Sequence, residues 1–193
     1  AEGRKPMKKQ LTAVLFLLLA ALALAGCGKK ADLSPQAQAL VGKWAYDYEP
    51  ESAALTLKAD GAAECEGRRY ARFTFDGTTL ELSCTDGPAA QIRCSSDDKG
   101  LIVYKRTDYH SDGAHDGLAG AWRSDEGGWS YEFNAEGAFL EDGTFSGTYA
   151  LDESAGTFTL QYADGQFADT LCYFTLDGDR LTVEYPWRMV RMK

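Results

Sequence analysis

The chain contains two copies of one β-rich pattern, and this duplication constrains its fold more than any other feature. Residues 40–44 (LVGKW) recur as residues 118–122 (LAGAW), a shift of 78, and residues 55–61 recur as residues 131–137, a shift of 76. The remaining matches, at a shift of 78, pair Leu80, Leu82, Cys84 and Cys94 with Phe158, Leu160, Tyr162 and Cys172. Landmarks that return in the same order predict two like structural modules.

Each copy has the pattern of short antiparallel strands joined by tight turns. Phe158, Leu160 and Tyr162 alternate with polar residues, which is typical of a strand with one buried face. Glycine preceded by Asp or Glu tolerates the positive φ of hairpin turns, and such pairs occur at residues 60–61, 76–77, 86–87, 136–137, 142–143, 164–165 and 177–178. We therefore predict an all-β fold of two tandem small antiparallel meander barrels or sandwiches, with six or seven short strands each.

The amino-terminal region has the parts of a secretory signal peptide. From Met7 the chain reads MKKQ, then fifteen residues (11–25) of which only Thr12 is polar, then Gly26-Cys27. As a helix, fifteen residues would rise about 22 Å, less than the roughly 30 Å of a bilayer core. We expect residues 1–26 to be a signal peptide, with residues 1–6 upstream of the true start.

The end of this segment, Leu24-Ala25-Gly26-Cys27, resembles the lipobox of bacterial lipoproteins. The resemblance implies that the chain is cut before Cys27. Cys27 would then carry the lipid, and one of its acyl groups would be palmitate. Residues 27–39 would be the lipidated tether. The implied location is the extracytoplasmic face of the cell membrane, with the protein held there by its lipid anchor.

The charge of the chain argues against nucleic acid as a partner. Residues 1–26 hold four of the 20 basic and one of the 29 acidic residues, so residues 27–193 carry a net charge of −12. Such a surface repels polyanions. Lys29 and Lys30 are an exception, because they lie next to the lipid and would be attracted to anionic headgroups.

The motif Gly-x-Trp opens both copies, at Gly42 and at Gly120. It resembles the first strand of lipocalins and, more closely, the shorter lipocalin-like repeats of bacterial lipoproteins. The implied modules are residues 40–106 and 118–193, joined by a linker at 107–117. The resemblance also implies that a basic residue closes the barrel against each Trp: Arg106 in the first copy and Arg188 or Arg191 in the second.

The length of each copy argues against a ligand inside it. A lipocalin closes eight long strands, and eight is about the minimum that can hold one small molecule. A copy of about 76 residues is expected to fill its interior with its own Leu, Phe and Tyr side chains.

Four cysteines follow Cys27, and outside the cytoplasm they allow three disulfide connectivities. Cys84 and Cys94 flank the turn at residues 86–87 and are the favoured pair. Cys172 shares a face with apolar residues and is expected to be a buried small hydrophobe. A set of free thiols, including Cys65, is the alternative.

The sequence contains no pattern of catalytic residues, so we predict a protein that is not an enzyme and has no cofactor. Both histidines, His110 and His115, lie in the expected linker beside three aspartates. They are ligand types for zinc, but a flexible segment holds a metal poorly, and no metal site is predicted. Asp177 and Asp179 lie in a turn, where Asp is expected for backbone reasons.

Two tryptophans are the candidates for surface contact with a partner. Trp44 and Trp122 are expected in the core, whereas Trp129 follows a Gly-rich turn and Trp187 follows the last alternating run. The first hypothesis is a membrane-anchored, non-enzymatic lipoprotein that binds an unknown protein or small molecule. The alternatives are an inhibitor of a secreted hydrolase, such as a lysozyme or protease, and a carrier of a small apolar ligand.

Overall fold

A computed structural model describes residues 32–163, 165 and 167–193, so Cys27 and the signal peptide lie outside the described residues. The described part contains the short helix α2 (Pro35–Leu40) and fifteen strands. In chain order the strands are β1 (Gly42–Tyr46), β2 (Leu55–Leu57), β3 (Ala63–Cys65), β4 (Arg68–Tyr70), β5 (Arg72–Phe75), β6 (Thr79–Ser83), β7 (Ala90–Asp97), β8 (Gly100–Ser111), β9 (Gly120–Ser124), β10 (Ser130–Phe133), β11 (Ala138–Glu141), β12 (Phe145–Asp152), β13 (Thr157–Tyr162), β14 (Thr170–Asp177) and β15 (Arg180–Arg191).

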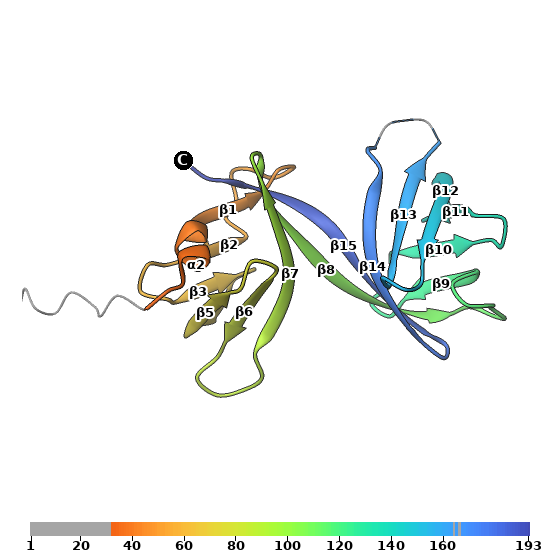
Figure 1. Cartoon of the computed structure of the whole chain (residues 1–193). Coiled ribbons are helices and arrows are strands. Elements are labelled where there is room, and N and C mark those ends of the chain that lie inside the picture. The colour runs from red at the N-terminus through yellow and green to blue at the C-terminus, as the bar shows by residue number, and fades with distance from the viewer. Residues whose placement is uncertain (1–31, 164, 166) are drawn as a thin grey trace, which may run out of the picture.

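The fold is all-β and antiparallel, as predicted, and it forms two lobes that share two long strands (Figure 1). Strands β8 to β15 close into an eight-stranded barrel, here called the second barrel, because β15 also pairs with β8. Strand β1 pairs with the C-terminal end of β15 and is followed in the sheet by β2, β3 and β4. Strand β7 pairs with the N-terminal end of β8 and is followed by β6 and β5. Strands β1 to β7 enclose a separate core and are called the first barrel. Strands β4 and β5 are the two ends of the sheet, so hydrogen bonding between them does not close it.

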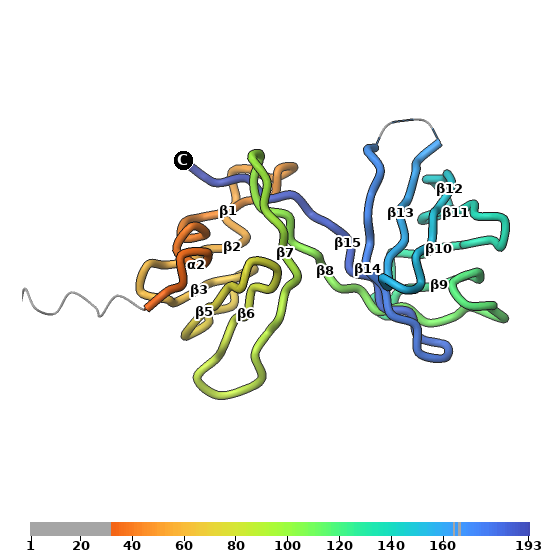
Figure 2. The backbone as a smooth tube through the Cα atoms, in the orientation of Figure 1, coloured from red at the N-terminus to blue at the C-terminus, as the bar shows by residue number. Residues whose placement is uncertain are grey.

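The two long strands are exchanged between the copies. Strand β8 ends the first copy and β15 ends the second, and both run from one lobe into the other (Figure 2). They pair along ten positions, with Lys105 opposite Tyr185 at the centre. Leu101 of β8 lies in the first core, but Tyr109 of the same strand lies in the second. On β15 the order is reversed: Leu181 lies in the second core and Met189 in the first.

This exchange corrects the predicted module boundaries. Residues 107–111, expected in the linker, form the end of β8 and belong to the second barrel. At the other end of the chain, Met189, Val190 and Arg191 pair with β1 and belong to the first barrel. The physical reason is that a strand of twelve residues is roughly 40 Å long, longer than a small barrel needs.

The repeat and its turns are present as the sequence indicates. The indole N–H of Trp44 donates to the Leu40 carbonyl at 2.8 Å, and that of Trp122 donates to the Leu118 carbonyl at 2.9 Å. The seven glycines of the predicted turn pairs all have positive φ, a conformation that costs glycine nothing; they are Gly61, Gly77, Gly87, Gly137, Gly143, Gly165 and Gly178.

The basic residue that closes each barrel differs from the one expected. Arg191 lies over the ring of Trp44, in the first copy, at 4.4 Å from its centre. Trp122 of the second copy is covered by His115, whose ring centre lies 4.8 Å away. Arg106 forms an ion pair with Asp108 on its own strand. Strand exchange explains the change, because it carries the end of the chain to the first barrel.

The predicted Cys84–Cys94 disulfide is not formed, and the four described cysteines after Cys27 are free. The register of β6 and β7 places Leu80 opposite Ile92, so Cys94 lies beside Thr78, roughly 20 Å along the strand from Cys84. The same register corrects one repeat match: Phe158 faces Cys172, so the counterpart of Cys172 is Ile92 rather than Cys94. Cys172 itself is buried, as predicted.

Candidate ligand-binding site at the mouth of the second barrel

A cavity of about 320 Å³ opens at one end of the second barrel. Its walls are largely aromatic and come from strands or turns that are distant in sequence, among them Trp129, Phe145, Tyr162, Tyr185 and Trp187. Pockets for small molecules begin at about 300 Å³ and are lined by apolar and aromatic groups with a few polar ones. The expectation that each copy fills its interior is therefore wrong at this end of the second barrel.

Glu141 is the buried polar group of the cavity. It is the last residue of β11, and only 8% of it is exposed. Its Oε1 accepts a hydrogen bond from the Tyr131 hydroxyl at 2.7 Å, and its Oε2 accepts one from the Tyr162 hydroxyl at 2.8 Å. Burial raises the pKa of Glu141, although both phenols oppose the rise.

The tyrosines around Glu141 belong to one hydrogen-bonded network. The hydroxyl of Tyr162 lies 3.4 Å from that of Tyr185. Burial is the main cause that raises the pKa of Tyr131 and of Tyr162, and the Glu141 carboxylate adds to it. Both phenols therefore keep their protons and remain hydrogen-bond donors to Glu141.

The two basic residues that line the cavity already have acidic partners. Lys105 Nζ lies 2.8 Å from Glu66 of the first barrel, and Arg106 pairs with Asp108 at 3.0 Å. Among the described residues, no Lys, Arg or His lies within ion-pair distance of Glu141. The buried carboxylate is thus compensated by phenols alone.

The two tryptophans proposed from the sequence as contact residues both line this cavity. Trp129 is 49% exposed at its rim. Trp187 is half-buried and packs edge-on against Tyr46 and Tyr48 of the first barrel and near Tyr185 of the second. The cavity therefore lies where the two barrels meet.

The equivalent position in the first barrel has no carboxylate. Tyr131 faces Glu141 across β10 and β11, and Leu55 faces Cys65 in the same register across β2 and β3. An apolar residue and a thiol therefore replace the phenol and the carboxylate, and the strands still pair in the same way. The barrel architecture does not require a charge at this point.

A second difference between the copies lies beside the cavity, at a residue that pairs with the lining residue Tyr109. Two residues after the opening Trp, the first copy has Tyr46 and the second has Ser124. The Tyr46 hydroxyl reaches Glu66 at 2.9 Å, in the turn that corresponds to Asp142. Ser124 is too short to do so. Its Oγ is buried and has no hydrogen-bond partner among the described residues.

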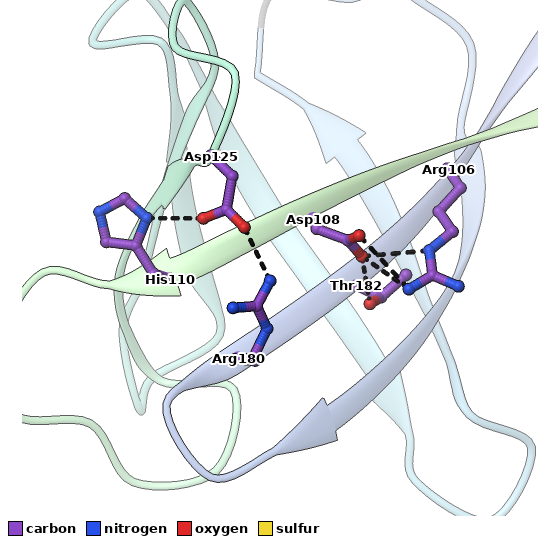
Figure 3. Close-up of polar contacts among 6 residues, drawn as sticks. All are labelled: Arg106, Asp108, His110, Asp125, Arg180 and Thr182. Carbon is purple, nitrogen blue, oxygen red and sulfur yellow. Dashed lines mark hydrogen bonds and ion pairs between the residues drawn. The ribbon is translucent and has the colours of Figure 1, made fainter.

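The histidines and aspartates of the expected linker take structural roles instead. Asp125 accepts Arg180 at 2.8 Å and lies 2.9 Å from Nδ1 of His110 (Figure 3). Asp108, which lies on β8 like His110, accepts a hydrogen bond from the Thr182 hydroxyl at 2.6 Å (Figure 3). These contacts join β8 to β15 and to the turn after β9. In the described ranges no three His, Cys, Asp or Glu side chains gather as metal ligands would.

Comparisons with protein-family models, with curated proteins and with solved structures found no match. Within the described residues, no helix has the length and apolar character needed to span a bilayer.

Sequence reasoning found the tryptophans of this site and missed its carboxylate. Glu141 directly precedes the turn predicted at residues 142–143, so its local sequence does not distinguish it from a turn residue. A signal was present in the repeat itself, because the alignment of residues 55–61 with 131–137 extends to Cys65 and Glu141. A charged residue that replaces a half-buried thiol at a matched strand position indicates a changed role.

Proposed function

We propose that the protein is a non-enzymatic ligand-binding lipoprotein, which binds a small molecule in the mouth of its second barrel. The observation that carries the proposal is the aromatic cavity of about 320 Å³ beside the buried Glu141. Rings from both sides of the barrel converge on it, and rings supply large contact area with little conformational entropy to lose. Of the functions that the sequence allows, the cavity favours binding or carrying a small ligand.

The lipid on Cys27 would hold this binding site at the extracytoplasmic face of the membrane. Residues 27–33 link that cysteine to Ser34, whose side chain accepts the Ala37 N–H and caps α2. At about 3.5 Å per residue, this part of the tether, residues 27–33, spans at most roughly 25 Å. Two or more acyl chains anchor a protein stably, where one does not. The ligand would thus be bound close to the membrane surface.

The matched variant Ser124→Tyr provides the test. It copies Tyr46 of the first barrel into the equivalent position and is expected to fill the cavity. The full-length protein and the variant, each in the same detergent, would be titrated with the neutral fluorescent probe N-phenyl-naphthylamine. Micelles take up the probe equally in both samples, so the difference between them reports the cavity.

The protein with Ser124 is expected to give saturable probe fluorescence above that of the micelles, which the Ser124→Tyr variant lacks. Thermal melting would establish that the variant is folded. Equal fluorescence from the two proteins would contradict the proposal, because the cavity would then take up no ligand.

A further inference from the structure

We infer that the cavity of the second barrel binds a small organic cation: a substituted ammonium with an apolar body, whose charge lies beside Glu141. This inference rests on the proposed function and specifies its ligand class. It follows from four features of the cavity: a buried carboxylate without a cation, acidic neighbours, aromatic walls and the contrast with the first barrel.

The first feature is the missing counterion. An ionised carboxylate that is removed from water is normally paired with a cation, because hydrogen bonds from neutral groups replace only part of its hydration. Glu141 accepts one phenol at each oxygen and has no cationic partner among the described residues. A positive ligand would supply the interaction that the protein does not.

The second feature is the charge of the surrounding lining. Asp142 and Glu126 also line the cavity. Asp142 accepts the backbone N–H of Ser130 at 2.6 Å, and Glu126 is exposed at the rim. Since Lys105 and Arg106 are paired with Glu66 and Asp108, the lining is acidic overall. It would attract a cation and repel an anion.

The third feature is the set of rings. The face of an aromatic ring carries a negative potential, so a quaternary or substituted ammonium is attracted to Trp, Tyr and Phe within about 6 Å of the ring centre. On one wall, the rings of Phe145 and Phe167 lie edge to face with their centres 5.4 Å apart. The ring centres of Phe167 and Tyr162 are 5.0 Å apart. Trp129 and Trp187 complete the mouth. These walls suit both the charge and the apolar body of such a ligand.

The fourth feature separates function from folding. The first barrel has Cys65 where the second has Glu141, in the same strand register. A buried carboxylate is unfavourable for the folded state when it has no cation. The fold is compatible with a neutral residue here, so the charge is explained by a ligand rather than by packing.

The experiment compares two molecules that differ only in charge. Benzyltrimethylammonium and neopentylbenzene have the same shape, with nitrogen in one replaced by carbon in the other. Each would displace N-phenyl-naphthylamine from the full-length protein at equal free concentrations set by dialysis. We expect the cation to displace the probe at a concentration at least about tenfold lower than its neutral isostere.

Two variants test whether Glu141 causes this preference. Glu141→Gln keeps the shape, and its amide can both accept from one phenol and donate to the other, so probe binding is expected to persist while the preference is lost. Glu136→Gln removes an exposed carboxylate of the same barrel away from the cavity and is expected to keep the preference.

Equal displacement by the two molecules, or a preference that persists in Glu141→Gln, would overturn the inference. Neither result would affect the proposed function, which fails only if the probe does not bind in the cavity. The comparison of the two molecules requires no variant, so it remains decisive if Glu141→Gln does not fold.

Discussion

The guanidinium of Arg191 lies over the ring of Trp44, with its central carbon 4.4 Å from the ring centre, although the two residues come from opposite ends of the described chain. Arg191 also donates to the carbonyls of Ala39 and Val41. A Cβ on Gly42 would lie 2.5 Å from its Nη1. In the second copy, a Cβ on Gly120 would lie 2.6 Å from the Cβ of His115. The glycine of each Gly-x-Trp motif therefore makes room for the side chain that covers the Trp.

Replacement of this arginine should destabilise the first barrel. Arg191→Ala removes a cation–π contact and two hydrogen bonds to carbonyls, and we expect a loss of about 1–3 kcal/mol in the free energy of unfolding, measured in urea. Arg69→Ala is the control, since that side chain is 90% exposed and its ion pair is 3.9 Å long. An equal loss of unfolding free energy in both variants would contradict a stabilising role for the contacts of Arg191.

The shared strands should make the two barrels unfold together. Met189 is 2% exposed in the first core, yet it lies on the strand that also carries Leu181 of the second. Met189→Ala is expected to destabilise by about 2–5 kcal/mol. Hydrogen exchange should show lower protection in both barrels, with Leu151→Ala, 38% exposed on β12, as the control. Loss of protection in the first barrel alone would contradict this coupling.

The buried carboxylate predicts a pH-dependent stability difference. Burial raises the pKa of Glu141 above its unfolded value, so the folded state holds this proton more tightly than the unfolded state. Its ionisation therefore weakens folding as pH rises from about 4.3, the ordinary value for Glu, through the raised pKa. Without ligand, the Glu141→Gln variant and the protein with Glu141 should have the same melting temperature at pH 4. At pH 8 the variant should have the higher melting temperature. Tyr131, Tyr162 and Asp142 surround residue 141 in both proteins, so their own effects on the pH dependence of melting largely cancel in the difference. A melting difference that does not change with pH would refute the prediction.

The free cysteines should differ in reactivity toward a thiol reagent. Burial raises the pKa of Cys65 to about 11 and that of Cys94 to about 12, and Cys172 is fully buried. Since the thiolate is the reactive form, we expect partly exposed Cys84 to react first and Cys94 and Cys172 only on unfolding. Thiol counting before and after denaturation without reductant checks this. Fewer than four thiols in the denatured chain, beyond Cys27, would indicate a disulfide.

The lipid anchor is a separate prediction from the sequence. Cys27→Ser should abolish incorporation of labelled palmitate and move the protein out of the membrane fraction when it is made in a bacterium. Cys84→Ser is the matched control and should remain labelled and membrane-bound. Labelling that survives in Cys27→Ser would place the lipid elsewhere.

The sequence predicted the local structure well, because alternation and turn glycines act over a few residues. Phe158 and Leu160 are buried, and Gly61 and Gly137 have the expected positive φ. It did not predict the partner of β15. Leu181 and Val183 indicate a strand, but alternation is the same whichever barrel a strand enters. Tyr109 carried a partial signal, since it continues the inward parity of Leu101 and Val103 into the expected linker.

The candidate site was only partly visible for a related reason. Trp129 and Trp187 could be chosen individually, but the cavity that they line also involves Glu141 and lies beside Ser124, and both of these are ordinary residues in their local sequence. Their meaning depends on comparison with Tyr46 and Cys65 at matched positions. The repeat aligns these positions, but their burial and their place around one cavity follow only from the pairing of the strands, which the sequence does not specify.

The pairing of β1 with residues 189–191 has a consequence for biogenesis. The amino-terminal core cannot acquire its last strand until residues 189–191 have been synthesised. The first barrel therefore stays one strand short while all the residues between β1 and β15 are being made. A first barrel that is completed this late is compatible with export of an unfolded chain, which the signal peptide expected at residues 1–26 would require.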